Sequence, residues 1–179
     1  SDLASLQSTA SRAYGTAGTT PFASDLSDTA QVRKILADNG APLSDMQLVI
    51  DTTAGAKMRT LTQLSKANEA ADNSLLRQGL LLDVHGMQIR ESAQIVTAGS
   101  NAITGTVTVT GSNAIGATSI GITTAGGSGV AAIAGDIITF AGDTNKYVVK
   151  TAVTVGASTT GTVVLAAPGL RIAKSATAA

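Results

Sequence analysis

Residues 91–110 read ESAQIVTAGSNAITGTVTVT, and the composition of the chain changes within this stretch, near Val96. The residues before Val96 carry 18 of the 24 acidic and basic side chains, whereas the 84 residues from Val96 onward carry six of them and 13 of the 19 glycines. Most of the second part is Thr, Ala, Ser, Val and Ile. The sequence therefore predicts an α+β protein, in which a charged, partly helical body is joined to a Gly/Thr-rich all-β module.

The second part of the chain predicts a small antiparallel barrel or sandwich. Residues 106–110 alternate Thr and Val, which is the pattern of a half-buried strand. We expect loops at residues 112–117 and 125–130. Short strand-like pieces at this spacing are typical of a small barrel, and they occupy about residues 103–110, 117–123, 136–140, 146–151, 152–155 and 161–166.

The first part predicts helices with recognisable ends. Residues 1–14 have the pattern of the end of a helix. A second helix is expected to begin at Asp28, which forms a capping-box pattern with Gln31, three residues later. Gly40 then provides a left-handed C-terminal cap for this helix.

Short apolar runs in the first part predict strands. Residues 46–50 read as a buried strand, and Asp51 can cap a helix that continues to about Leu64. Further strands are expected at residues 80–84 and 87–95, separated by a tight turn at His85 and Gly86.

The overall composition excludes several classes of protein. The formal net charge is zero and no Lys/Arg run is present, so specific nucleic-acid binding is not expected. The chain has no cysteine, which removes disulfides and thiol chemistry and fits a reducing cytoplasm. No apolar run approaches the roughly 20 residues that a membrane helix needs. The core must be aliphatic, because only four residues are aromatic.

His85 is the one histidine and the strongest candidate for catalysis. Asp83 lies two residues earlier, so in an extended segment both side chains would share a face and could serve a nearby Ser or Thr. The alternative is a turn histidine beside Gly86, which we favour because no nucleophile elbow is present. We therefore predict that the chain is not an enzyme and has no catalytic residues.

Other candidate sites have simpler interpretations. Asp25 with Asp28, or Asp136 with Asp143, could offer oxygens to Ca²⁺, but neither pair has the dense spacing of a calcium loop. The glycine-rich residues 125–129 lack the lysine of a phosphate-binding loop. A glycosidase uses a pair of acidic side chains, but the acidic residues before Val96 fall at helix caps, turns and helix faces. The chain also has no Trp that could stack on a sugar. We expect no metal and no cofactor.

Long ordered blocks of sequence carry a family resemblance. They are distributed along the chain between Arg12 and Arg171, and residues 97–130 match least well. The blocks are RAYGTAGTTPF (12–22), DTAQVRKIL (28–36), DNGAP (38–42), LVIDT (48–52), RTL (59–61), KANEA (66–70), LLRQG (75–79), RESAQ (90–94), GDIITFAGDTNKYVV (135–149) and AAPGLR (166–171). They resemble the major capsid (coat) proteins of tailed bacteriophages and prophages, in the branch similar to the coat proteins of short-tailed phages (podoviruses).

The resemblance implies the Hong Kong 97-type capsid fold. Residues 1–14 would then be the end of the spine helix, and residues 15–96 the α/β body of the axial domain. Residues 97–172 would be the inserted β-barrel domain, and residues 173–179 a tail. A complete coat protein of this kind also has an N-terminal arm, more spine helix and a peripheral domain. We therefore expect the chain to be a fragment, or the product of a decayed prophage gene, that remains a monomer or small oligomer.

The resemblance also implies a function and partners. The family has no catalytic residues, and its members are structural proteins of the icosahedral shell that packages viral DNA. The implied partners are other copies of the same protein and a scaffolding protein, and the implied location is the virion capsid, assembled in the cytoplasm of the bacterial host. The alternative hypothesis is a decoration or adhesion module on the virion surface, which would bind a host or partner through its β segment.

Overall fold

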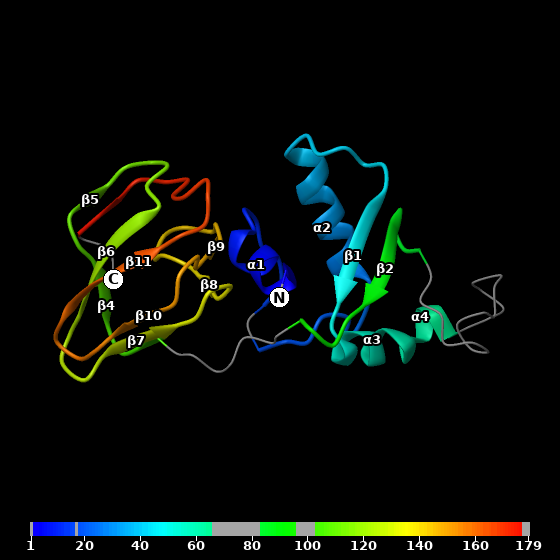
Figure 1. Cartoon of the computed structure of the whole chain (residues 1–179), viewed down its shortest axis with the longest axis horizontal. Helices are drawn as coiled ribbons and strands as arrows, with labels where there is room; N and C mark the ends of the chain where they lie inside the picture. The colour runs from blue at the N-terminus through cyan, green and yellow to red at the C-terminus, as the bar shows by residue number, and fades with distance from the viewer. Residues whose placement is uncertain (1, 17, 66–82, 96–102, 177–179) are drawn as a thin grey trace. The chain divides into compact units, whose positions relative to one another are not determined.

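The computed structural model describes residues 2–16, 18–65, 83–95 and 103–176. The chain divides into two compact units, which are residues 14–96 and residues 1–13 together with 97–179 (Figure 1). Each unit has its own cluster of buried apolar side chains. The described residues form helices and small sheets, so the prediction of a mixed α+β chain is confirmed.

The unit formed by residues 14–96 combines short helices with a two-stranded parallel sheet. Strands β1 and β2 pair with Met46 opposite Met87 and Ile50 opposite Glu91. Parallel neighbours need a crossover connection, and α3 and α4 lie on it. The elements are α2 (Ser27–Asp38), β1 (Met46–Ile50), α3 (Thr52–Arg59), α4 (Thr62–Ser65) and β2 (Met87–Glu91).

One face of this small sheet supports the core of the unit. Ile50 of β1 and Ile89 of β2 are buried with Met58 of α3, which is 0% exposed. Phe22 joins them from the loop before α2 and is 3% exposed. The alternating residues on the other face, Gln47 and Val49, are exposed, so a strand forms where the sequence predicts one, but it is buried on one face only.

The helix ends agree with the sequence prediction in two of three places. Asp51 caps α3 by accepting hydrogen bonds from the amides of Thr53 and Ala54 at 3.2 and 3.1 Å. Gly40 follows α2 with φ of 73°, as its left-handed cap requires. The prediction for Asp28 is wrong: α2 already begins at Ser27, and Asp28 accepts the amide of Phe22 at 3.3 Å instead.

Several predicted boundaries need correction. The first helix, α1 (Asp2–Thr9), is shorter than residues 1–14, and the helix expected to reach Leu64 is interrupted between α3 and α4. Strand β2 ends at Glu91 rather than near residue 95. Most of the strand expected at 80–84 lies outside the described residues.

The tight turn at His85 and Gly86 is confirmed. These residues have φ of 51° and 75°, and the amides and carbonyls of Val84 and Met87 exchange hydrogen bonds of 3.1 and 3.0 Å around them. Two consecutive positive φ values are typical of the type I′ turn, whose backbone twist matches that of the two strands it connects.

The second unit contains short antiparallel strands. Its described strands form four small sheets, ordered β10-β7-β3, β11-β6-β4, β12-β5 and β8-β9, and no closed barrel. Strands of two to six residues separated by glycines bend too often to close one continuous sheet. The strands are β3 (Ile103–Thr104), β4 (Val107–Val109), β5 (Ser112–Asn113), β6 (Ser119–Thr124), β7 (Gly129–Ala132), β8 (Ile137–Ile138), β9 (Tyr147–Val148), β10 (Val153–Val155), β11 (Thr160–Val164) and β12 (Lys174–Ser175).

Three segments that the sequence assigned to loops or to the tail contain strands. Strand β5 starts the predicted loop at 112–117, and β7 begins at Gly129, within the predicted loop at 125–130. Strand β12 lies in the predicted tail at 173–179 and pairs with β5. Each of these strands is rich in small or polar residues, so its strand character comes from pairing with a neighbour rather than from its own hydrophobic pattern.

The core of the second unit is aliphatic, with one buried tyrosine. Ile120 and Val149 are 0% exposed, Leu165 and Leu170 are 1% exposed, and Tyr147 is 3% exposed. A turn at Gly169 delivers Leu170 to this core, and the amide of Leu170 donates to the carbonyl of Ala117 at 3.0 Å.

A substitution at Gly169 would show how rigidly this turn packs against the backbone of residues 116 and 117. A Cβ at Gly169, where φ is 77°, would collide with the carbonyls of Gly116 and Ala117, whereas a Cβ at Gly142, where φ is 69°, would meet nothing within 4 Å. We expect Gly169→Ala to lower the unfolding free energy by about 3 kcal/mol and the control Gly142→Ala by about 1 kcal/mol. Denaturant unfolding followed by circular dichroism measures both; equal losses would show that the close approach is not rigid.

Candidate functional site

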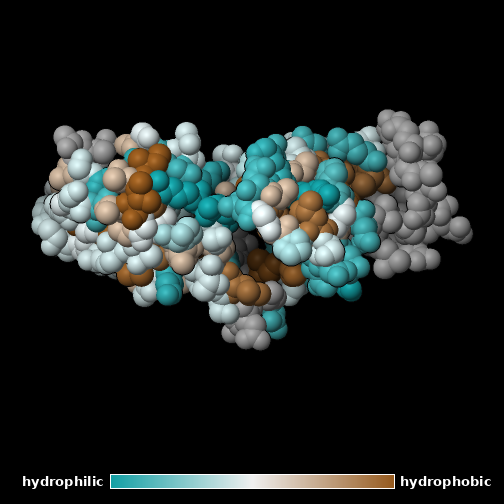
Figure 2. Space-filling view, turned by 90° about the horizontal axis from the view of Figure 1, so that it is seen from above, coloured by the Kyte–Doolittle hydropathy of each residue, from teal (hydrophilic) through white to brown (hydrophobic). Residues whose placement is uncertain are grey.

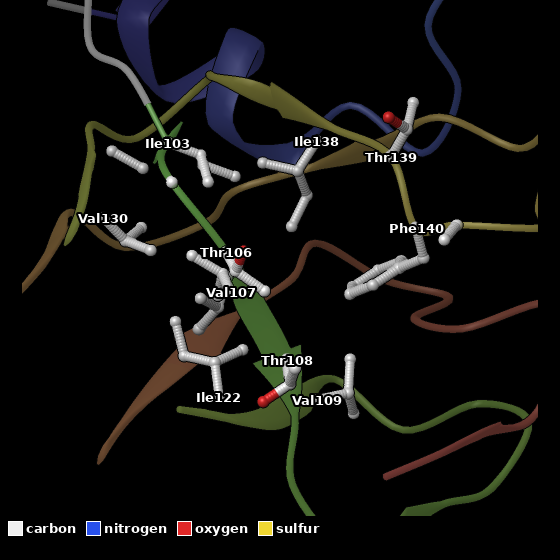
Figure 3. A pocket seen from close by; sticks show the side chains of 14 residues that line it. Ile103, Thr106, Val107, Thr108, Val109, Ile122, Val130, Ile138, Thr139 and Phe140 are labelled. Carbon is white, nitrogen blue, oxygen red and sulfur yellow. The ribbon is translucent and has the colours of Figure 1, made fainter. Parts of the chain in front are cut away.

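An open cavity of about 520 Å³ lies in the second unit and is here named the β4 slot. Strand β4 runs along one side, and Ile138 and Phe140 point into the cavity from the other side (Figure 3). Most of the walls are aliphatic. The lining residues are Ile103, Gly105, Thr106, Val107, Thr108, Val109, Ile122, Val130, Ala132, Ile138, Thr139, Phe140, Ala141 and Val163.

Strand β4 is an edge strand, and its free edge borders the slot. Its one partner among the described strands is β6. The amide of Thr110 donates to the carbonyl of Gly121 in β6 at 2.8 Å, so these two residues form a hydrogen-bonded pair. Along an antiparallel ladder, such pairs alternate with pairs whose backbone groups point away from the partner strand. The backbone groups of Val107 and Val109 therefore face away from β6. No hydrogen bond within the described part of the chain reaches them on that side.

The chemistry of the slot is neutral. None of the lining residues has an ionisable side chain, and its polar groups are backbone amides and the hydroxyls of Thr106, Thr108 and Thr139. Ile103 lines the slot and is 51% exposed. Elsewhere, apolar side chains reach the surface in separate places among polar ones on the face seen in Figure 2. A mainly apolar cavity with a few polar groups is the usual form of a binding site.

A buried carboxylate organises the segment that follows Phe140. The side chain of Asp143 is 0% exposed; one oxygen accepts hydrogen bonds from the amide and the side chain of Asn145 at 2.8 and 2.7 Å, and the other accepts from the hydroxyl of Tyr147 at 2.7 Å. The ammonium of Lys174 lies 3.9 Å from the second oxygen and donates to the carbonyl of Ala141 at 3.0 Å. Ala141 lines the slot, so this network fixes one of its walls.

Arg171 extends the network to the end of the first helical segment. Its guanidinium donates to Asn145 at 2.8 Å and to the carbonyl of Ser11 at 2.9 Å, and lies 5.6 Å from the centre of the Tyr147 ring. Burial lowers the pKa of Arg171, and repulsion from Arg12 lowers it further. Burial also raises the pKa of Tyr147, and the neighbouring Asp143 carboxylate raises it further.

Opposing effects set the pKa of Asp143. Burial raises this pKa, but hydrogen bonds from Asn145 and Tyr147 and the charge of Lys174 outweigh burial, so the pKa lies below its usual value. The group therefore remains ionised at neutral pH. Its role is structural, because every oxygen contact described above goes to a group of the same unit.

The geometry around His85 corresponds to a turn histidine. Its Nδ1 lies 2.7 Å from the hydroxyl of Thr29, and that hydroxyl donates to the carbonyl of Leu26 at 2.7 Å. Thr29 has one hydroxyl proton, so Nδ1 must carry the proton that they share. Thr29 is 1% exposed, which leaves it unavailable as a nucleophile. Within the described residues, the side chain of His85 hydrogen-bonds to Thr29 and its carbonyl accepts from Arg33, and neither bond involves Asp83.

The other acidic candidates serve local turns. Asp25 accepts the amide of Ser27 at 2.8 Å, and Asp136 accepts the amide of Ile133 at 2.8 Å. In the part of the chain that the structure describes, no three His, Cys, Asp or Glu side chains gather as a metal site would require. In the glycine-rich loop, Ser128 is 4% exposed and accepts the amide of Thr106 at 2.9 Å, so it ties this loop to the start of β4.

No model of a known protein family matches the chain, and no curated protein matches it significantly. None of the helices described is long and apolar enough to cross a membrane. Function must therefore be inferred from the sequence blocks and from the geometry of the two units.

Removing the Asp143 carboxylate should destabilise the second unit. Asp143→Ala leaves the Tyr147 hydroxyl, the Asn145 amide and the Lys174 charge without their acceptor, and we expect a loss of about 3 kcal/mol in unfolding free energy. Asp136→Ala is the matched control; it removes one hydrogen bond, worth about 1 kcal/mol. Denaturant unfolding compares them, and a cost for Asp143→Ala no larger than for the control would contradict the assigned role.

The same carboxylate predicts an acid dependence. Because the folded pKa of Asp143 lies below the unfolded value of about 3.9, its contribution is complete above about pH 5 and is lost as the pH falls through the folded pKa. The difference in unfolding free energy between the natural chain and Asp143→Asn should therefore shrink from pH 6 to pH 2. Urea titrations across this range measure it; a constant difference would show that ionisation of Asp143 contributes nothing.

Proposed function

We propose that this chain forms part of the major capsid protein of a tailed bacteriophage or prophage. The observation that carries the proposal is the series of ordered sequence blocks between Arg12 and Arg171 that resemble coat proteins of the short-tailed phage branch. Short motifs of this kind arise by chance, but ten blocks in the same order along one chain are far more specific. The proposed role is structural, in the icosahedral shell around viral DNA.

On this proposal the chain contributes to a Hong Kong 97-type fold. Residues 1–14 would end the spine helix, residues 15–96 would form the axial-domain body, and residues 97–172 would form the inserted β domain. The division of the chain into two separately built units supports such an insertion, because one change of unit falls at residues 96–97. The Arg171–Ser11 hydrogen bond would join the inserted domain to the spine segment.

The proposed mechanism is geometric rather than catalytic. Many identical copies tile a closed shell, and symmetry repeats each interface. Each contact can be weak, because a subunit held by several neighbours gains the strength of all of them together. The zero net charge supports this role, since copies of the chain do not repel one another as strongly charged proteins do.

The direct test is to express the complete reading frame that contains this chain, together with any neighbouring scaffolding gene, and to image the lysate by negative-stain electron microscopy. We expect uniform closed particles. The same frame carrying Gly169→Ala is the control, because a misfolded second unit should reduce the yield of particles.

A soluble full-length protein with native circular dichroism and no particles, despite the scaffolding protein, would contradict the capsid proposal. That result would instead favour the decoration or adhesion hypothesis. Screening the folded protein against host surface fractions would then be the next experiment.

A further inference from the structure

Two strand edges border the β4 slot, and both have unpaired backbone groups. Val107 and Val109 turn their amides and carbonyls away from β6. The second edge belongs to the segment that continues β8. The amide of Val149 donates to the carbonyl of Asp136 at 2.8 Å, and hydrogen-bonded pairs alternate with pairs that are not hydrogen-bonded along the β8-β9 ladder. Counted from Asp136, the backbone groups of Ile138 face β9 and those of Thr139 face away from it. No hydrogen bond within the described residues satisfies the backbone of Thr139 there.

The unpaired amides and carbonyls on both sides of the slot are those that a sheet would expose if one of its strands were missing. Val109 is only 5% exposed, yet its amide and carbonyl have no partner within the described residues. A buried backbone group without a partner is costly, and in native proteins nearly all such groups are paired. The slot therefore has the unmet hydrogen-bonding capacity that an added strand would satisfy.

We propose that the β4 slot binds an extended, uncharged peptide segment of another polypeptide, which adds to the edge of β4 as a further strand. Strand addition obtains affinity from main-chain hydrogen bonds and specificity from pockets for alternate side chains. The slot offers both, because its free edges lie beside an apolar floor formed by Ile122, Val130 and Val163.

The absence of charge in the slot determines which side chains the partner segment can place there. A charged side chain that entered would lose its hydration without meeting an opposite charge, because no ionisable group lines the slot. The inward-facing residues of the partner are therefore apolar, and β-branched residues suit both the pleated geometry and the aliphatic walls. Serine or threonine at the alternate, outward positions would keep the segment soluble.

The sequence of the edge supports a binding role. Natural proteins protect free edges with lysine, proline, bulges or short strands. Residues 103–109 read ITGTVTV and contain neither a charge nor a proline. Charged residues do flank another short strand of the same unit, since Lys146 and Lys150 stand on either side of β9. Neither lysine nor proline thus protects the edge of β4, although the strand itself is short, at three residues.

The test uses the chain itself and a synthetic probe. The probe is fluorescein-labelled GTVTVTG, which copies the alternation of residues 105–111, and the control peptide is GTKTKTG. Fluorescence anisotropy should show saturable one-to-one binding of the probe. The lysines should weaken binding by about tenfold or more, because they place two charges against the apolar floor.

Substitutions in the protein distinguish strand addition from simple apolar contact. Val107→Pro removes an amide that faces the slot and leaves the β4-β6 ladder intact, a position where proline is tolerated. We expect it to weaken probe binding about tenfold, as the loss of one main-chain hydrogen bond implies. Thr139→Lys should weaken binding similarly, whereas Thr162→Lys, at an exposed position of β11 that does not line the slot, should change it less than about twofold.

Three outcomes would overturn the proposal. The first is no saturable binding of the probe, and the second is equal binding by Val107→Pro with native circular dichroism. The third is a dimer of the chain alone that Val107→Pro converts to a monomer in sedimentation, which would make a second copy the occupant. Failure here is separate from failure of the capsid proposal, because the binding experiment requires no particles.

Discussion

The ionised carboxylate of Asp143 is the interaction on which the second unit most depends. The strands of this unit hold two to six residues, so several of its ladders contain too few hydrogen bonds to fix their own positions. Asp143 compensates by joining Asn145, Tyr147 and Lys174 around one buried charge. Burying a charge costs several kcal/mol unless its partners are all in place. The segments that carry these partners must therefore be correctly folded together.

The effect of this network extends beyond its own loop. Tyr147 also accepts the amide of Arg171 at 3.1 Å, and Arg171 in turn reaches Ser11. A polar chain of contacts thus connects residues that lie about 160 positions apart in sequence. Buried Thr124 has a similar function at another corner, since its hydroxyl donates to Gly156 at 2.6 Å and accepts from the Thr159 amide at 3.1 Å. Side-chain bonds to the backbone replace the long ladders that these strands lack.

Local signals predicted the features that local physics controls. The cap at Asp51, the left-handed Gly40 and the turn at His85 each depend on two or three neighbouring residues, and the structure contains all three. The cap assigned to Asp28 was wrong because the N-cap position falls at Leu26, and Asp25 rather than Asp28 accepts the amide of Ser27 at the start of the helix. Strand β1 was predictable because its apolar run is buried on one face.

Long-range features could not be predicted in this way. Asp143 reads as a turn residue in sequence, and it is one, but its contact with Lys174 depends on a chain reversal through Gly169 that no local pattern encodes. The β4 slot was missed for a related reason. Residues 106–110 predict a strand correctly, but the sequence does not show which edge of that strand stays unpaired. The nearest signal is the absence of charge and proline along residues 103–109.

An unpaired edge beside an apolar cavity has a physical consequence for the kind of protein that carries it. Water in the open slot can reach half-buried Val107 more readily than Val109, which is 5% exposed, and it gains nothing from the aliphatic walls around them. The free energy of the slot is therefore lowered by any occupant that supplies both hydrogen bonds and apolar surface, and an extended peptide supplies both. A protein that acts alone would be expected to protect such an edge. Leaving it open suits a subunit whose sheets are completed by neighbouring chains, and this requirement is common to a shell protein and to a module that docks on one.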